Sequence, residues 1–216
     1  MARLTRKEKQ AHTRECLMRS AASVFARRGL QQASIDEVAE DAGFTKGAFY
    51  ANFKSKEELF LAMLDERFAK RIEDIEGVIA GEGSPAQKAR RAGDVFVQSL
   101  RADREWERLF FEFSAYAARD EDFRQELVTR YRAMRAGVGA ALKAHAEELG
   151  KEPTLPFDQV ALMTGVMANG FALEKLLEGD AVPDELYGTM LMVFFAGLDA
   201  LKESAPLAAV GAGAAS

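Results

Sequence analysis

The sequence is poor in the residues that build disulfides and metal sites. Its 216 residues include one cysteine, Cys16, and two histidines, His12 and His145. A single cysteine excludes an intramolecular disulfide and is typical of an intracellular chain. Neither histidine has a partner at metal-ligand spacing, and His145, at a polar helix end, is expected to be solvated. We therefore expect a cytoplasmic protein with no metal and no cofactor, in which Cys16 is a half-buried small residue.

Long apolar segments and catalytic signatures are also missing. Residues 3–14 are charged and polar, with no apolar signal core behind them. The longest uncharged runs, 160–173 and 186–198, are shorter than the roughly 20 residues of a membrane span, so we expect buried helices and no membrane partner. We find no nucleophile elbow, phosphate-binding loop, dinucleotide fingerprint or zinc pattern. An enzyme would need a catalytic constellation that the chain does not show.

Charge is unevenly distributed. The formal net charge of -5 argues against a general nucleic-acid binder. Residues 1–56, however, hold 11 Lys and Arg against 6 Asp and Glu, whereas the remainder holds 18 against 28. A basic N-terminal segment on an acidic body is expected when only one end of a protein meets DNA.

The most informative segment is 34–56, which predicts two short helices joined by a tight turn. Ser34 and Glu37 form a capping box for the first helix. Gly43 lies where a left-handed backbone is cheap only for glycine, and Thr45 then caps the second helix. An ordinary helical hairpin with solvated lysines is the alternative, but the joint occurrence of these signals disfavours it.

The second of these helices carries a face suited to DNA. Phe49 and Phe53, four residues apart, are expected to face the core. The opposite face carries short side chains together with Lys46, Tyr50 and Asn52, so it can approach base edges and offer donors to phosphates and bases. The segment has no arginine, so it cannot make a bidentate guanidinium contact to guanine. Its sequence specificity is therefore expected to depend more on Lys46, Thr45 and the shape of the DNA.

The rest of the chain predicts helices only. Ser55 with Glu58, and Ser84 with Pro85 and Gln87, mark two further helix starts with capping boxes. No segment has a convincing strand pattern, so the fold is predicted to be all-α, with about nine helices. Outside 34–56 the expected helices are 5–28, 55–80, 85–101, 104–118, 121–149, 157–178 and 183–203. The Ala/Gly-rich end, 206–216, is expected to be disordered.

These residues carry a resemblance to a known family. The chain resembles the TetR (tetracycline-repressor-like) family of bacterial regulators over roughly its first third, and 106–132 bears a looser likeness to the choline-responsive BetI group. The matching motif is Phe25-Ala26-x-x-Gly29, then Ser34-Ile35-x-x-Val38-Ala39-x-x-Ala42-Gly43-Phe44-Thr45-x-Gly47-Ala48-Phe49-Tyr50-x-x-Phe53-x-Ser55-Lys56-Glu57-x-Leu59.

The resemblance implies a ligand-responsive regulator of transcription, with a repressor favoured over an activator. A homodimer would place one helix of each subunit in the major groove of an inverted-repeat operator, and a small molecule would release the DNA. It implies a helix-turn-helix domain at 1–54, an effector-binding and dimerisation domain at 55–204, and a disordered tail at 205–216. The residues assigned to DNA contact are Thr45, Lys46, Gly47 and Ala48 at the groove-entering turn, Tyr50 and Lys56 at phosphates, Asn52 at a base or phosphate, and Ser34 at a phosphate.

Two features of the body refine this expectation. The last two long helices are rich in apolar and small residues and need burial on more than one side, which supports dimerisation through them. Aromatic and methionine side chains could line a pocket for an apolar or aromatic effector, although each could equally be plain core, and Glu112 could anchor a ligand or pair with an arginine. The candidate ligand residues are Phe96, Trp106, Phe110, Glu112, Phe113, Tyr116, Tyr131, Met134, Met163, Met167 and Phe171.

Two other hypotheses stay open at this point. One is an all-helical enzyme, and the other is a non-specific DNA-binding protein without effector control. The second predicts broad basicity and no sequence preference, so a comparison of operator with random DNA separates it from a regulator.

Overall fold

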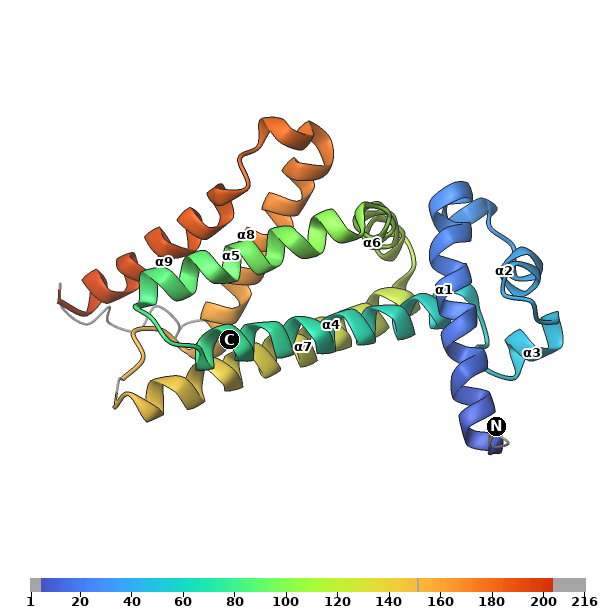
Figure 1. Ribbon diagram of the computed structural model, residues 1–216, viewed down its shortest axis with the longest axis horizontal. Helices are drawn as coiled ribbons and strands as arrows, with labels where there is room; N and C mark the ends of the chain where they lie inside the picture. The colour runs from blue at the N-terminus through green and yellow to red at the C-terminus, as the bar shows by residue number, and fades with distance from the viewer. Residues whose placement is uncertain (1–4, 151, 204–216) are drawn as a thin grey trace, which may run out of the picture.

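The protein was analysed as a computed structural model that describes residues 5–150 and 152–203. Within these residues every regular element is a helix, so the all-α prediction is confirmed (Figure 1). The expected tail at 205–216 lies outside the described residues. The helices are α1 (Arg6–Gln32), α2 (Ile35–Asp41), α3 (Lys46–Tyr50), α4 (Lys56–Ala80), α5 (Pro85–Ala102), α6 (Arg104–Ala117), α7 (Glu121–Glu148), α8 (Phe157–Glu178), a short 3-10 turn η1 (Gly179–Ala181) and α9 (Glu185–Glu203).

Capping explains why the helices begin where the sequence predicts. The side chains of Ser34 and Ser84 each complete a capping box, with Glu37 and Gln87 respectively. At α4 the prediction is half wrong. Ser55 caps the helix, but the Glu58 carboxylate accepts from the backbone N–H of Lys54 at 2.6 Å, one residue earlier than a capping box requires.

The three-helix unit α1–α3 lies at one end of the molecule, and α4 runs from it along the body beside α7 (Figure 1). Gly43 joins α2 to α3 with a φ of 75°, as its place in the sequence predicts. Helix α1 reaches past the predicted end, because a further helical turn follows a backbone break at Gly29. The start of α4 therefore lies against the N-terminal unit, and its end lies in the body.

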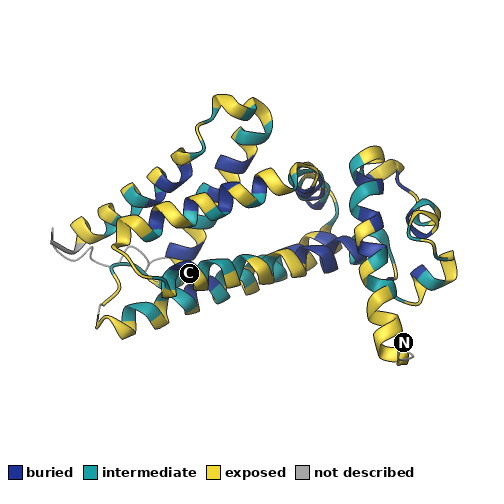
Figure 2. Ribbon diagram, in the orientation of Figure 1, coloured by how far each residue is buried: buried dark blue, intermediate teal, exposed yellow. Residues whose placement is uncertain are grey.

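Two separate buried clusters hold the chain together (Figure 2). The first, here called the first core, joins α1–α3 to the first half of α4, to α6 and to the start of α7. Its largest side chains are aromatic, and the rings of Phe60 and Phe113 stack with centroids 3.5 Å apart. The second core joins α5, α8 and α9 around Phe96, Phe171 and Tyr187. Burial therefore divides the molecule across α4 rather than before it.

A close helix crossing closes the second core. Gly93 of α5 faces Gly188 of α9, and a Cβ atom built on Gly93 would lie 2.5 Å from the Cα and N atoms of Gly188. No side chain can occupy that space, because the obstacle is backbone. The two glycines therefore allow α5 and α9 to pack backbone against backbone.

Candidate nucleic-acid interface and ligand cavity

Helix α3 presents its first turn to solvent. Thr45 caps it, and its Oγ1 accepts a hydrogen bond from the N–H of Ala48 at 3.2 Å. Phe49 and Phe53 are fully buried beneath it, as predicted, while Lys46, Gly47 and Tyr50 are exposed. The outer face of α3 thus combines a free helix start with small and donor-bearing side chains, which suits a groove of DNA.

Gly47 has no structural reason to be glycine. A Cβ atom there would meet only the Thr45 hydroxyl, at an ordinary 3.7 Å, and its φ is not positive. Glycine inside a helix costs roughly 0.5–1 kcal/mol relative to alanine. The absence of a side chain at Gly47 therefore does not serve packing within the protein. It leaves space on the outer surface of α3 for a binding partner.

The charged groups near α3 are held by the protein itself. The Lys46 ammonium donates to the Asp36 carboxylate at 2.8 Å, and this hydrogen bond raises the pKa of Lys46. Both side chains are more than half exposed, so the pair is weak. A phosphate could replace Asp36 as the partner of Lys46 at little cost.

Two of the predicted contact residues are turned inward. The Asn52 side-chain amide donates to the Ala48 carbonyl at 2.8 Å, and its Oδ1 is buried without a partner among the described residues. The Lys56 ammonium donates to the carbonyls of Leu30 and Ala33, each at 2.8 Å, and so ties α4 to the end of α1. Ser34 is exposed at the start of α2. DNA contact by these residues stays a prediction.

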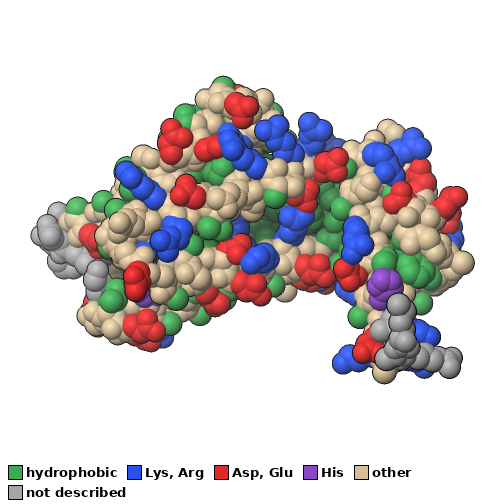
Figure 3. All heavy atoms as spheres, viewed as in Figure 1, with side chains coloured by type: hydrophobic (Ala, Val, Ile, Leu, Met, Phe, Trp, Pro, Cys, Tyr) green, Lys and Arg blue, Asp and Glu red, His purple; other side chains and the backbone are tan. Residues whose placement is uncertain are grey.

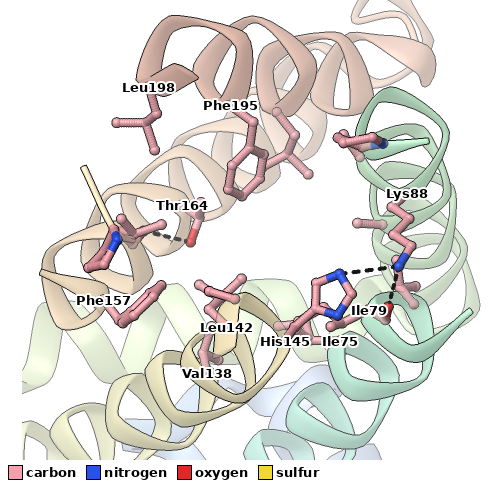
Figure 4. Close-up of a pocket in the computed structure, with 18 of the residues that line it drawn as sticks. Ile75, Ile79, Lys88, Val138, Leu142, His145, Phe157, Thr164, Phe195 and Leu198 are labelled. Atoms are coloured by element: carbon pink, nitrogen blue, oxygen red, sulfur yellow. Dashed lines mark hydrogen bonds between the residues drawn. The ribbon is translucent and has the colours of Figure 1, made fainter. Parts of the chain in front are cut away.

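The body encloses a cavity of about 570 Å³ between α4, α5, α7, α8 and α9 (Figure 4). This volume falls in the range of about 300 to 1,000 Å³ that is typical of small-molecule sites. Side chains of all five helices surround the space, and most are aliphatic. Those labelled in the figure include Ile75, Ile79, Val138, Leu142, Phe157, Thr164, Phe195 and Leu198.

Lys88 and His145 form a polar pair on the cavity wall (Figure 4). The Lys88 ammonium donates to the Ile79 carbonyl at 2.6 Å and lies 3.3 Å from Nε2 of His145. An ammonium only donates, so Nε2 is the acceptor and the ring proton lies on Nδ1. The prediction of a solvated His145 holds only in part, because 26% of its side chain is exposed and the ring meets Lys88 on the cavity wall.

Arg71 of α4 lines the same cavity and lies over the Phe96 ring, with its central carbon 4.0 Å from the ring centroid. Burial lowers the pKa of Arg71, because it penalises the charged form, while nearby Tyr187, Glu107 and Asp74 act against this. Among the described residues none accepts a hydrogen bond from this guanidinium or forms an ion pair with it. Burial also raises the pKa of Tyr187 to about 12, and that of Glu107 to about 6 despite the nearby Arg71.

Of the predicted ligand residues, only Phe96 lines this cavity. The reason is the orientation of α6 and the start of α7, whose aromatic faces pack on α1 and α4 rather than on the cavity. Trp106, Phe110 and Phe113 belong to the first core, and Tyr116 and Tyr131 pack against it. Met163 is exposed on α8, and Met167 and Phe171 belong to or pack against the second core. Met134 is half-buried on α7, outside the cavity lining.

Glu112 does not line this cavity, and it forms no ion pair with an arginine that the structure describes. Its Oε1 accepts from the backbone N–H of Leu30 at 2.7 Å, at the end of α1. The carboxylate fits against Gly29, where a Cβ atom would lie 3.1 Å from Oε1. Glu112 thus ties α6 to the backbone of the N-terminal unit.

The sequence did hold a signal for the cavity residues that the aromatic pattern missed. Arg71 interrupts the apolar stripe of α4, four residues before Ile75 and seven before Val78, on one face of the helix. Both of those residues line the cavity with it. A charge on an apolar helical face was therefore a better marker of the cavity than aromatic content.

Helices α8 and α9 leave apolar side chains uncovered. Val166 and Leu177 on α8 and Val193 on α9 are 61%, 70% and 68% exposed. By length and composition alone, the α8–η1 segment Phe157–Ala181 is long and apolar enough to cross a membrane. Of its most apolar 18-residue stretch, 28% of the residues are buried inside the protein. The uncharged run 160–173 is as short as predicted, but the helix that contains it continues past Glu174 and Lys175.

His12 and Cys16 lie one turn apart on α1, with Nε2 3.7 Å from Sγ, and Cys16 is half-buried as expected. In the part of the chain that the structure describes, no three His, Cys, Asp or Glu side chains gather as a metal site would require. On the face seen in Figure 3, basic and acidic side chains are interspersed over the body.

Known families and proteins are similar to this chain in sequence. The family model for bacterial regulatory proteins of the tetR family matches residues 17–63, and the model for the C-terminal part of BetI-type transcriptional repressors matches residues 85–200. The transcriptional activator FasR of Mycolicibacterium smegmatis is 32% identical over 110 residues, which cover 51% of this chain and 48% of FasR. AcrR of Shigella flexneri is 42% identical over 60 residues, 28% of this chain and 27% of AcrR.

Solved structures share the fold over most of the chain. A TetR-family regulator from Rhodococcus sp. has a TM-score of 0.70 at 20% identity, over 87% of this chain and 98% of that one. FadR from Bacillus subtilis, solved with stearoyl-CoA, has a TM-score of 0.67 at 16% identity, over 83% and 96%. The chain spans about half the length or less of the curated relatives it matches. With the BetI-type model covering more than half of the sequence, the chain belongs to the TetR family of bacterial regulatory proteins.

Proposed function

We propose that this protein is a ligand-responsive transcriptional regulator that binds an inverted-repeat operator in double-stranded DNA as a homodimer. The observation that carries this proposal is the outer face of α3. There a capped helix start exposes Lys46 and Tyr50. Beside them lies Gly47, which has no side chain although the fold has room for one. A helix surface with this relief can approach base edges closely.

The contact residues follow from the same face. We propose that Thr45 to Ala48 enter the major groove and that Tyr50 donates to a phosphate. Lys46 exchanges Asp36 for phosphate or base oxygens. Ser34 offers a phosphate contact at the start of α2, and Lys56 keeps one N–H for a phosphate beyond its two carbonyl acceptors. Asn52 reaches DNA only if its amide leaves the Ala48 carbonyl.

Dimerisation is supported by the uncovered apolar faces of α8 and α9. A scattered apolar residue on a surface needs no explanation, but two adjacent helices that share such a face indicate a partner. A second copy of the same face would cover both sides at once by two-fold symmetry. The two α3 helices would then read half-sites about 34–36 Å apart, or a multiple of that distance.

The domain assignment is part of this proposal. Residues 1–54 form the DNA-binding domain, and 55–204 form the effector-binding and dimerisation domain, with α4 as the link between them. The cavity is the effector site. The protein acts in the cytoplasm, as a repressor released by its effector, without enzymatic activity and without a membrane partner.

The test is selection of double-stranded DNA from a random pool by the purified protein at near-physiological salt, followed by sequencing of the bound fraction. We expect an inverted repeat with one fixed half-site spacing. Salt-sensitive binding without an enriched motif would contradict the proposal and favour the non-specific DNA binder. The oligomeric state in solution, measured at the same protein concentration, tests the homodimer separately.

A further inference from the structure

Among the described residues that line the cavity, one cation, Arg71, forms neither a hydrogen bond nor an ion pair. Three positive or titratable basic groups line the cavity: Arg71, Lys88 and His145. The Lys88 ammonium is already engaged by the Ile79 carbonyl and by His145. The Arg71 guanidinium has neither a hydrogen bond nor an ion pair to any described residue. Arg71 is partly buried, and the nearby Glu107 and Asp74 carboxylates act on it through their charge alone. Donors removed from water without an acceptor are costly, so the Arg71 N–H groups call for an acceptor that a ligand can supply.

The way in which Arg71 is held leaves its donors accessible. Its guanidinium lies on the Phe96 ring at 4.0 Å, and Phe96 is fixed in turn against Tyr187, with ring centroids 4.7 Å apart. Stacking engages the flat face of the guanidinium, whereas its five N–H groups point outward in its plane. Such an edge matches the two oxygens of a carboxylate.

The acids around the cavity limit the charge that a ligand can bring. Asp74 lines the wall three residues after Arg71 and is itself paired with Lys70 at 2.8 Å. Asp199 and Glu152 also line the cavity, and both residues are exposed at its rim. A ligand with several phosphates would meet these acids, and among the described lining residues Arg71 alone has a cation without a hydrogen-bond acceptor to offset them. A single negative charge fits the balance better.

The remaining wall defines the other end of the ligand. It is formed mainly by branched aliphatic side chains of α4, α7, α8 and α9, such as Ile79, Leu142, Val160 and Leu191. Burying an alkyl chain against such a surface is favourable in proportion to the apolar area removed from water. We propose that the cavity binds an aliphatic monocarboxylate, with the carboxylate on Arg71 and the alkyl chain along the aliphatic wall.

The inference rests on the proposed function in one respect, which is that the cavity is the effector site. Its test measures binding without DNA. Titration calorimetry at pH 7.5 and near-physiological salt would compare decanoate with decanol and with decyltrimethylammonium, each below its micelle concentration. We expect decanoate to bind at least about tenfold more tightly than decanol, since a charge-assisted hydrogen bond to a buried partner is worth that much or more. The ammonium probe should bind most weakly.

Variants locate the charge. Arg71→Met should reduce the affinity for decanoate about tenfold, to the level of decanol, while leaving the affinity for decanol unchanged; Arg71→Lys should retain part of the preference. Arg67→Met, one turn earlier on α4 and outside the cavity lining, is the matched control and should bind decanoate like the unaltered protein.

Several results would overturn the inference. Equal affinities for decanoate and decanol, no binding of decanoate, or a loss of selectivity in Lys88→Met but not in Arg71→Met would each do so. The DNA selection is carried out with the same preparation of unaltered protein, so failure of the inference with an enriched operator leaves the proposed function standing. If no operator is enriched but decanoate binds selectively, the proposed regulator function is contradicted and the carboxylate site in the cavity stands.

Discussion

The first and second cores respond to the same need, the burial of apolar side chains, in opposite ways. The first core closes around stacked aromatic rings, and several of its side chains have no exposed surface at all. The second core is smaller and borders a cavity of about 570 Å³, and its helices leave apolar faces uncovered on the outside. The difference indicates where rigidity and adaptability are needed. A surface that reads DNA must be held in one shape, whereas a body that binds a ligand and a partner must keep room for both.

The strongest test of this contrast is truncation of one side chain in each region. Phe113→Ala removes a fully buried ring that stacks on Phe60 and should lower the free energy of unfolding by about 3–5 kcal/mol. Leu142→Ala, in the half-buried cavity wall, should cost less than half as much, because the space that it leaves joins an existing cavity. Urea denaturation of both variants measures the difference. Equal losses would show that the two regions are packed alike.

The glycine crossing tests whether the second core is loose throughout. Gly93→Ala should lower the free energy of unfolding by about 1–3 kcal/mol, because the new methyl group would meet the backbone of Gly188. Gly77→Ala, in an exposed part of α4 with open space around it, is the matched control and should raise stability by about 0.5–1 kcal/mol. If both variants were more stable than the unaltered protein, α5 and α9 would be able to move apart, and their close contact would not limit the side chain at position 93.

The hydrogen bond that joins α6 to the end of α1, within the first core, can be broken at Glu112. Glu112→Ala leaves the buried N–H of Leu30 without its acceptor and should cost about 1–3 kcal/mol. Hydrogen exchange at the Leu30 amide should become faster in this variant. Glu112→Gln keeps an oxygen acceptor at the same place and should retain most of the protection. Unchanged exchange in Glu112→Ala would mean that water replaces the carboxylate.

Stability should also depend on pH through Glu107, which lies on α6 near Arg71 and Arg67. Burial raises its pKa from 4.5 to about 6 in the folded protein, so between these values the folded chain holds more protons than the unfolded chain. Stability therefore falls as the pH rises through this interval. Glu107→Gln cannot ionise and should be more stable at pH 7.5 by up to about 2 kcal/mol, with the gain vanishing below pH 4.5. Thermal unfolding at both pH values measures this, and a gain independent of pH would contradict it.

The smallest effect on stability is expected at the surface of α3. Gly47→Ala should leave the fold intact and raise the free energy of unfolding by roughly 0.5–1 kcal/mol. At the same time it should weaken binding to the selected operator, because the methyl group occupies the space left for a groove. Fluorescence anisotropy with labelled operator measures the affinity. An unchanged affinity would remove the argument that Gly47 serves DNA binding.

Much of the fold could be predicted because its signals are local. Caps such as Ser34 and Ser84 and the left-handed Gly43 fix helix boundaries through neighbours in sequence. The cavity could not be predicted in the same way. Aromatic residues such as Phe113 indicate burial, but which of two cores receives them depends on how α6 is oriented, which no local signal records. The partners of charged residues could not be predicted either, since Lys56 and Glu112 bond to backbone groups of Leu30, more than 20 residues away.

The path of α4 from the first core into the body has a consequence for protein engineering. Exchanging DNA specificity between regulators by grafting is natural at the turn before α4, near residue 54. In this protein, however, a graft that ends there would take α1–α3 from the donor and Phe60, Leu64 and Phe113 from the recipient. Surfaces that did not evolve together would then have to pack in the first core. A functional chimera would need the matching faces of α4 and α6 as well, so the transferable unit is discontinuous in sequence.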